Sequence, residues 1–403
     1  MSTRDLRTRL QTVRAYLGTY GWLALGGAIL VLVGLQWLGP LSTSRASLLF
    51  FAVGLFLVVW NLLLLRATGV LEFAHDHAWT LLAVFAVGAV AVQAAGLLNS
   101  YWSTVALQMF MFGVLALSWD LIGGQTGYPS FGNMAFFGIG GYTAAVLFKN
   151  YGVALPLTLV VAAVMALVFA AIIGVIVLRL RGGYFAIATL GVLLVAIQVA
   201  RNLSITGGTD GIILLDVPDQ ALIYYGMLAV LVTEIAVVYY LSTTRFGYVL
   251  NTIRDDERKA TAMGINTTYY KTAAWGLSAL FTGLVGAMWA PYNTFIDPAT
   301  AFNTAWNVEF IVMAFIGGTG TVIGPVLGAF GIRSLVFQID SLFTGWQLVV
   351  LGVVVIVTVI GLPEGLVGQL KQRASALKYY EYGGGAAGGA EAADADATEG
   401  GND

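Results

Sequence analysis

The sequence predicts an all-α polytopic membrane protein with about 10–12 transmembrane helices. Hydrophobic residues make up 59% of the 403 residues and charged residues only 10%, whereas a soluble domain is about 25% charged and about half apolar at most. Apolar stretches of about 20 residues, the length that crosses a bilayer, recur along the chain. Fifty glycines accompany them, and in lipid glycine lets helices approach closely or interrupts them at functional sites.

The chain divides into three predicted parts. Residues 1–100 hold about three plain apolar spans, which we interpret as an appended transmembrane segment. These spans lie at 22–38, 46–65 and 80–98. Four arginines precede the first of them and no small-residue cleavage site follows it, which favours a retained anchor over a signal peptide. Residues 101–370 are the predicted membrane core, and 371–403, rich in Gly, Ala and acidic residues, are a predicted disordered cytoplasmic tail.

Seven further apolar segments of the core are candidates for single helices. They are 102–119, 131–148, 154–178, 184–200, 221–241, 272–291 and 347–363. Between the last two, the apolar region 308–337 is interrupted by GGTGT at 317–321. We predict two short helical pieces around a break there, and this region leaves the number of spans between ten and twelve.

Positively charged residues orient these spans. If the N-terminus is cytoplasmic, alternation of the spans places 15 of the 19 lysines and arginines on the cytoplasmic side, as the positive-inside rule requires. Only Arg45, Lys149 and Arg201 fall outside, and Arg333 has no clear side. Both termini are therefore predicted to be cytoplasmic, which requires 308–337 to cross the membrane twice.

Glycines are concentrated in the stretch 117–147, where a loop is predicted to separate two spans. In the helix after this loop, Gly138, Gly140 and Gly141 share one face that suits close approach of another helix. They line a permeation path or serve helix packing alone. Asp120, at the predicted membrane boundary, is either solvated or a buried functional acid.

The break at 317–321 is the strongest candidate for a permeation path. Irregular backbone at membrane depth is tolerated only where protein or a water-filled cavity surrounds it, and broken helices commonly form transport sites. The candidate path residues in this region are Glu309, Gly317, Gly318, Gly320 and Pro325. A short likeness between MAFFGIGG from Met134 and MAFIGGTG from Met313 fits an inverted repeat, since the two run in opposite predicted directions.

Two glycine pairs are predicted to form turns between spans. ITGGTDGI, at 205–212, places Gly207, Gly208 and Asp210 in an exposed turn on the outer side, which contacts a partner or only reverses the chain. Arg181, in LRLRGG, precedes a turn on the cytoplasmic side, and we interpret it as an anchor of topology.

A charged stretch stands out from this apolar chain. Six consecutive charged residues, Arg254 to Lys259, lie on the predicted cytoplasmic side and are followed by small residues at Ala260, Ala262 and Gly264. A solvated loop would explain the charge. It would not require the small residues, which suit close contact with another protein.

Several classes of function are excluded or disfavoured. No G-x-x-x-x-G-K-[ST] loop occurs, so the chain does not bind ATP in that way, and the absence of cysteine excludes thiolate chemistry. A net charge of −2 argues against nucleic-acid binding. His75 and His77 flank Asp76 in what we interpret as a solvated loop rather than a metal site. No catalytic, metal or cofactor residue is predicted.

Five stretches occur in the order found in one family, and together they resemble the LivM-type permease subunits of ABC importers for branched-chain amino acids. They are DLIGGQTGYPSFGNMAFFGIGGYTAA, LRLRGGYFAIATLG, ITGGTDGI, RFGYVLNTIRDDERKATAMGIN and GGTGTVIGPVLGA. The resemblance covers about residues 101–370. One departure is Asn133, where these permeases often carry a histidine.

The resemblance implies a cell-membrane permease with discontinuous helices that forms a translocation path with a second permease subunit. It also implies two ATPase subunits, which use ATP while this chain binds no cofactor, and an extracytoplasmic binding protein that delivers a small solute. Gly207, Gly208 and Asp210 are then candidates for contact with that binding protein. The segment from Arg254 to Asn266 is then a short helix that couples to the ATPase, with candidate residues Arg254, Asp255, Asp256, Glu257, Arg258, Ala260, Ala262 and Gly264.

Two alternatives stay open. Permeases for urea and short-chain amides look similar, so the resemblance extends less securely to branched-chain amino acids as the solute. A secondary transporter driven by an ion gradient would use Glu234, inside the span 221–241, or Asp120 as the ion carrier. The lack of further acids or of a basic relay within the spans disfavours this class, and Glu234 is otherwise an acid bonded to a neighbouring helix.

Overall fold

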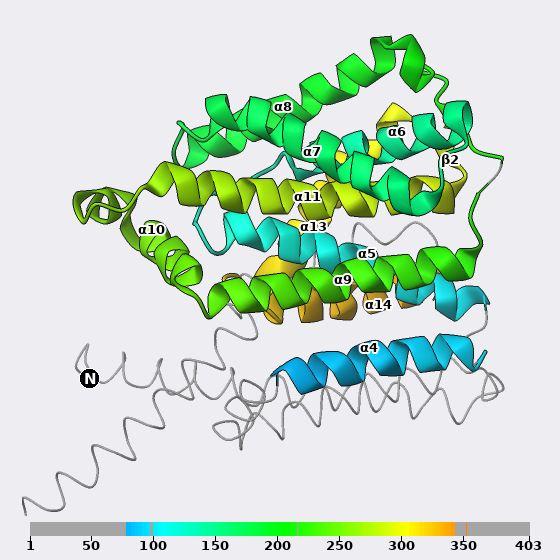
Figure 1. The fold of residues 1–403 in the computed structure, drawn as a ribbon, viewed down its shortest axis with the longest axis horizontal. Helices are drawn as coiled ribbons and strands as arrows, with labels where there is room; N and C mark the ends of the chain where they lie inside the picture. The colour runs from blue at the N-terminus through cyan, green and yellow to red at the C-terminus, as the bar shows by residue number, and fades with distance from the viewer. Residues whose placement is uncertain (1–77, 97–99, 216, 343–351, 353–403) are drawn as a thin grey trace, which may run out of the picture. The chain divides into compact units, whose positions relative to one another are not determined.

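The computed structural model describes residues 78–96, 100–215, 217–342 and 352. From Trp79 onward they belong to one compact unit that is almost entirely helical (Figure 1). The predicted spans 22–38 and 46–65 and the acidic tail lie outside the described residues, and of the predicted span 347–363 only residue 352 is described.

The helices agree with the predicted spans throughout the described part of the chain. The seven predicted spans there correspond to α4 (Ala78–Ala94), α5 (Ser100–Gly123), α6 (Asn133–Tyr151), α7 (Leu155–Val177), α8 (Gly183–Asn202), α9 (Gln220–Ser242) and α11 (Thr267–Asn293). By length and composition, six segments among the described residues qualify as membrane spans. They are α5, α7, α8, α9, α11 and Pro298–Gly317.

The predicted break in the region 308–337 is present. After the short α12 (Pro298–Ala301), helix α13 (Thr304–Gly317) ends at the first glycine of GGTGT, and α14 (Gly324–Leu342) begins after the turn 318–323. Gly318 and Gly320 have φ of 117° and 74°, which are left-handed values that glycine adopts without strain. The glycines therefore let the chain reverse between two helices that pack against each other.

Polar side chains and glycine fix several helix ends. Asn266 accepts a hydrogen bond from the Tyr269 N–H at the start of α11, and Asn303 does the same for the first turn of α13. Both satisfy backbone donors that have no partner within the helix. Gly152 ends α6 in a left-handed conformation, which is common at helix C-termini.

Helices α6 and α11 pack closely because glycines face each other's backbone. A Cβ atom at Gly140 would overlap the Gly283 carbonyl, and one at Gly286 would overlap the Phe137 carbonyl. In lipid, such close approach replaces the hydrophobic effect as a source of helix association. The predicted tightly packed face of α6 is therefore confirmed.

The glycine face of α6 and the break at 317–321 contact different elements. Gly138 lies against the Phe302 ring and Gly141 against Ile296 and Gly286. The break at 317–321 contacts other elements instead, so within this chain the two candidate path segments do not face each other.

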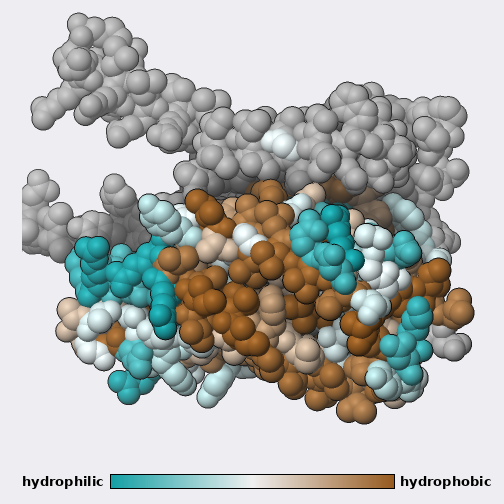
Figure 2. Space-filling model, turned by 90° about the horizontal axis from the view of Figure 1, so that it is seen from above, coloured by the Kyte–Doolittle hydropathy of each residue, from teal (hydrophilic) through white to brown (hydrophobic). Residues whose placement is uncertain are grey.

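Burial separates central from peripheral helices. In α5, 83% of the span is buried within the protein, compared with 28% in α7 and in α8. The outward sides of α7 and α8 carry large apolar side chains such as Val160, Ile172 and Ile187. Figure 2 shows hydrophobic residues over much of the middle of one face, with a hydrophilic group at its left end. This pattern suits a surface surrounded by lipid or by other membrane proteins.

The long helices have two distinct ends. At one, β1 (Ile212–Ile213) pairs antiparallel with β2 (Phe295–Ile296), close to the short helix η1 (Ser204–Thr206). At the other lies α10 (Arg245–Ala262), to the left in Figure 1. We refer to these as the β1–β2 end and the α10 end.

Candidate functional site

The charged segment is not one continuous helix. Asp256 has extended backbone angles (φ −162°, ψ 104°), so α10 consists of two helical pieces joined at this residue. The second piece ends at Ala262, and Gly264 has a φ of 81°. The expected single helix from Arg254 to Asn266 is therefore wrong at both ends. Helix begins at Arg245, breaks at Asp256 and stops before Gly264.

Asp256 explains why a second helical piece can start there. Its carboxylate accepts hydrogen bonds from the N–H groups of Arg258 (2.9 Å) and Lys259 (3.1 Å), as a side chain at a helix start does. The backbone hydrogen bond from Lys259, together with that from Arg258 and the Lys259 charge, lowers the pKa of Asp256. We call residues 257–262 that follow it, together with the cap residue Met263, the short helix.

Glu257, the first residue of the short helix, turns toward the protein interior. Its Oε1 lies 2.6 Å from Lys271 Nζ and its Oε2 lies 3.0 Å from Arg181 Nε. The Tyr128 hydroxyl donates to the same carboxylate. We call these four residues the Glu257 cluster, and they join the short helix to α11, to the α7–α8 turn and to the α5–α6 loop.

The Glu257 cluster is nearly closed to solvent at its centre. The side chain of Lys271 is 5% exposed and that of Glu257 10%, and Lys271 Nζ also donates to the Leu178 carbonyl at 3.3 Å. Burial of the carboxylate opposes its charge, but hydrogen bonds from Lys271 and Tyr128 and the nearby cations outweigh this and lower the pKa of Glu257. The short helix is thus held to the core by a satisfied charge pair.

The opposite side of the short helix faces outward. Arg258, Lys259 and Ala262 are exposed, and Met263 is 67% exposed. Ala260, by contrast, is fully buried in the protein's own core, so it is not available for contact with a partner. Gly264 has open space around it and lines a shallow pocket with Arg245, Val249, Ile265, Asn266, Tyr269 and Tyr270.

A second group of contacts lies beside this segment. Gly320 donates its N–H to Asp120 Oδ1 at 2.8 Å, and Arg254 Nη1 donates to the Gly124 carbonyl at 3.0 Å. A Cβ atom at Gly124 would overlap Asp120, and one at Gly320 would overlap Arg254. We call these four residues the glycine junction.

The glycine junction brings together three stretches that the sequence singled out separately. They are GGQTG after α5, the charged segment and GGTGT between α13 and α14. The buried position of Asp120, which has no exposed surface, excludes the simple solvated interpretation of this acid.

These motifs agree with comparisons of the whole sequence. Residues 101–359 match the family model described as branched-chain amino acid transport system / permease component. The chain is a member of this family. The permease is 26% identical over 310 residues to the high-affinity branched-chain amino acid transport permease LivM of Escherichia coli, covering 68% of this chain and 72% of that protein.

Other relatives give the same result. LivM of Salmonella typhimurium is 26% identical over 65% of this chain and 69% of its own length. A probable branched-chain amino acid permease LivH of Methanocaldococcus jannaschii is 25% identical over 63% of this chain and 88% of its own. No solved structure significantly matches the chain. The permease is thus a multi-pass, non-catalytic transport subunit of the ABC type.

The remaining candidate path residues of the permease are packed within the chain. A Cβ atom at Gly317 would overlap the Gly324 carbonyl. Because Gly317 has no side chain, the first turn of α14 can pack against the last turn of α13. Gly318 and Pro325 are buried beside them. These glycines make a tight turn, and their place on a permeation path stays a prediction.

Glu309 pairs with Arg333, the arginine whose side of the membrane the sequence left open. Arg333 Nη1 lies 2.7 Å from Glu309 Oε1, and its Nε and Nη2 donate to Gln108 at 3.1 and 2.5 Å. The guanidinium also lies over the Phe112 ring at 4.3 Å. The sequence alone does not predict this pair, because its members are 24 residues apart on two helices whose packing depends on the turn between them.

Two polar residues inside the spans have hydrogen-bond partners on neighbouring helices. Ser118 donates to Glu234 at 2.5 Å, which links α5 to α9 and matches the interpretation of Glu234 as an acid bonded to a neighbouring helix. Asn133, at the position where related permeases often carry histidine, donates to the Ser278 hydroxyl at 2.9 Å. It links α6 to α11 and carries no titrating group.

At the β1–β2 end, the predicted turn with Gly207, Gly208 and Asp210 is present. Gly207 and Gly208 have φ of 75° and 61°, and Asp210 is exposed. Large apolar side chains are also exposed close to it in sequence, with Ile213 at 62% and Leu215 at 88%.

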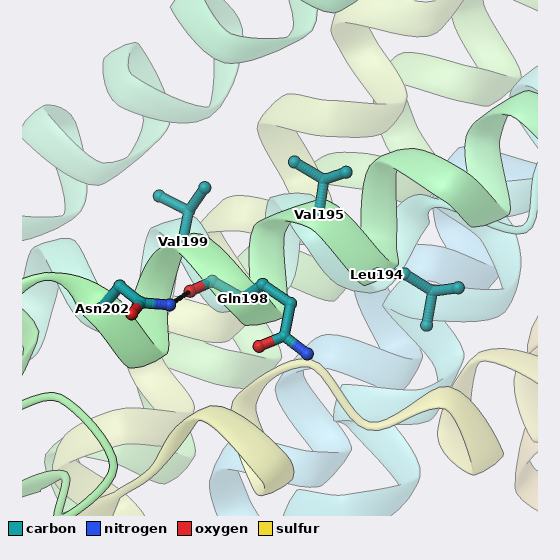
Figure 3. Close-up of a pocket in the computed structure, with 5 residues that line it drawn as sticks. All are labelled: Leu194, Val195, Gln198, Val199 and Asn202. Atoms are coloured by element: carbon teal, nitrogen blue, oxygen red, sulfur yellow. Dashed lines mark hydrogen bonds between the residues drawn. The ribbon is translucent and has the colours of Figure 1, made fainter.

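The exposed side of α8 carries a shallow depression. It is lined by Leu194, Val195, Gln198, Val199 and Asn202 (Figure 3). Figure 3 shows Val195 and Val199 pointing away from Leu194 and Gln198, and the Asn202 amide donating to the Gln198 carbonyl at 2.7 Å. The amide groups lie in the last two turns of α8, close to the β1–β2 end, so this depression is a surface feature of a peripheral helix rather than a path through the protein.

Proposed function

We propose that this permease imports branched-chain amino acids across the cell membrane as part of an ATP-driven ABC importer. It would form the translocation path with a second permease subunit, above two cytoplasmic ATPase subunits, and would receive its solute from an extracytoplasmic binding protein. The α10 end and both termini would then be cytoplasmic, which agrees with the bias of positive charge.

One observation carries the coupling part of this proposal. The short helix presents Arg258, Lys259, Ala262 and Met263 outward, while Glu257 fastens it to three other elements of the core. A solvated loop needs no such fastening. A helix that receives force from a partner protein must be held firmly to the permease core. Otherwise the force would break its contacts instead of moving the spanning helices.

The test is retention of the ATPase subunits by tagged variants of the permease. In Ala262→Trp, a bulky group on the outward side of a helical residue overpacks the proposed contact, at a cost of about 1–3 kcal/mol. We expect weaker co-purification of the ATPases and loss of uptake. Gly264→Trp is expected to act likewise, although its φ of 81° also strains any side chain there.

Asp255→Asn is the matched control, because Asp255 is exposed and exposed charges contribute about 0–1 kcal/mol. It should retain the ATPases and transport normally. Normal retention and normal uptake in Ala262→Trp would contradict a role of the short helix in coupling.

The solute is tested by uptake in cells that lack this permease, with leucine, isoleucine, valine and urea supplied separately. Loss of uptake of the three amino acids alone would support the proposal. Loss of urea uptake alone would assign the permease to the related amide importers.

Docking of the binding protein is proposed for the turn at the β1–β2 end. Asp210 is exposed there beside apolar Ile213 and Leu215, a combination suited to a protein contact with a polar rim. Asp210→Lys should weaken binding of the solute-loaded binding protein to the importer in a salt-dependent way, whereas Asp219→Lys, at the start of α9, should not.

A further inference from the structure

The glycine junction lies between the segment proposed to receive force and the turn between α13 and α14. The hydrogen bond from Arg254 to Gly124 joins residues 130 positions apart, and that from Gly320 to Asp120 joins residues 200 positions apart. Both bonds end on the last turn of α5 or on the loop directly after it. The charged segment and the α13–α14 turn are therefore fastened to the same few residues.

The Arg254 side chain lies close to two glycines. A Cβ atom at Gly127 would lie 3.3 Å from Arg254 Cγ, and one at Gly320 would overlap Arg254 Nη1. The stem of the arginine therefore lies along the loop after α5, and its head lies against the α13–α14 turn. A side chain on either glycine would push the arginine away from that turn.

Asp120 supplies an electrostatic reason for the arginine. A carboxylate in the last turn of a helix is opposed by the negative end of the helix dipole, and Asp120 occupies the last turn of α5 with no exposed surface. Among the described residues, Arg254 is the cation whose charge acts on it. The Asp120 side chain accepts a hydrogen bond from the Gly320 N–H. Arg254 can therefore affect the α13–α14 turn both by direct contact and through Asp120.

Arg254 also lies two residues before the Asp256 break in α10. Glu257 fastens the chain immediately after that break to α11 and to the α7–α8 turn. Movement of the short helix can therefore be passed to the rest of the protein through Glu257 or through Arg254. Of the two, only Arg254 contacts the α13–α14 turn.

We propose that Arg254 is a positioning residue that transmits movement of α10 to the α13–α14 turn, through its contacts with Gly124 and Gly320. This rests on the proposed function, since it assumes that α10 receives movement from an ATPase. Arg254 is exposed as a residue, but its Nη1 is bonded to the Gly124 carbonyl, so we assign it a role within the permease in addition to its place in the segment proposed to couple to the ATPase.

The first experiment measures the junction in the purified full-length permease, whatever the solute. Hydrogen–deuterium exchange is followed in peptides that contain Gly317 to Gly324. In Arg254→Gln we expect exchange there to be about tenfold faster, the change that corresponds to loss of one hydrogen bond from a charged group. Exchange in Arg254→Lys should fall between the two, and Asp219→Asn, at an exposed acid before α9, should match the wild type. Unchanged exchange in Arg254→Gln would overturn the proposal.

The second experiment separates a link from a merely structural contact. The complete importer in proteoliposomes is assayed for leucine taken up per ATP hydrolysed, with Arg254→Gln and the control Asp219→Asn in parallel. We expect Arg254→Gln to keep its ATPases and their hydrolysis while uptake per ATP falls about tenfold, and Arg254→Lys to restore part of it. An unchanged ratio, or loss of the ATPases from the complex, would overturn the proposal.

Asp120→Asn keeps the shape of the side chain and its acceptor oxygen but removes the acidic group beside the junction. If the arginine acts through this acid, the double variant Arg254→Gln/Asp120→Asn is no worse than Arg254→Gln alone. Additive losses would assign the two residues to separate roles. A wild-type importer that takes up no leucine would instead contradict the proposed function, and the exchange experiment would still decide the role of Arg254.

Discussion

Glu257 is the residue on which the polar contacts at the α10 end converge. It accepts hydrogen bonds or ion pairs from three side chains on three different elements. Such a cluster differs from an exposed ion pair, because Glu257, Lys271 and Tyr128 are largely removed from water, although Arg181 is 54% exposed. The buried charges of Glu257 and Lys271 therefore need each other.

Glu257→Gln should therefore destabilise the permease strongly. Lys271 would keep its charge with only 5% of its side chain exposed and without an anionic partner, and loss of one member of a buried pair costs about 3–5 kcal/mol. The melting temperature of the purified permease is expected to fall clearly in Glu257→Gln and to stay unchanged in Asp255→Asn. Equal melting temperatures would show that the cluster contributes no more than a surface pair.

The same cluster predicts a dependence on pH. Folding lowers the pKa of Glu257 from its ordinary 4.5. The contribution of Glu257 to the free energy of unfolding is therefore fully present above its ordinary pKa, and it is lost as the pH falls through the lower pKa of the folded state. The difference in melting temperature between wild type and Glu257→Gln should be constant from about pH 7 to about pH 5 and should narrow below about pH 4. A gap that narrows near neutral pH would point to another titrating group.

At the scale of elements, the packing of α6 on α11 depends on glycines that meet backbone. Gly140→Leu should prevent this packing, because even a Cβ atom there overlaps the Gly283 carbonyl, and we expect little folded permease in detergent. Gly191→Leu, on α8 where nothing lies within 4 Å of the added atom, is the matched control and should express normally. Size-exclusion profiles of the two variants measure the difference, and similar profiles would contradict the account of this interface.

The elements differ in how far the sequence could predict them. The spans from 102 to 291 were predictable because long apolar runs leave the chain few alternatives in lipid, and the α13–α14 break followed from glycines inside such a run. The kink at Asp256 was not, since it depends on a side chain that caps a helix within a charged run. Arg181, Lys271 and Tyr128 came from different motifs, and only the folded chain brings them to Glu257.

At the scale of the whole molecule, the proposed orientation can be tested cleanly because the chain contains no cysteine. Lys259→Cys, at the α10 end, should react with a membrane-impermeant maleimide only when the cytoplasmic side is opened. Leu215→Cys, which is 88% exposed near the β1–β2 end, should react from outside. Labelling of Lys259→Cys in intact cells would show that the permease has the opposite orientation to the one proposed.

The central claim, that ATP hydrolysed by partner subunits drives import of branched-chain amino acids through this permease, is tested most directly by leucine uptake into proteoliposomes that contain the complete importer and its binding protein. We expect uptake that requires ATP and both ATPase subunits, is lost in Ala262→Trp, and is unaffected when ion gradients are collapsed. Leucine uptake by the permease without ATPases, driven by an ion gradient and abolished in Glu234→Gln, would contradict it.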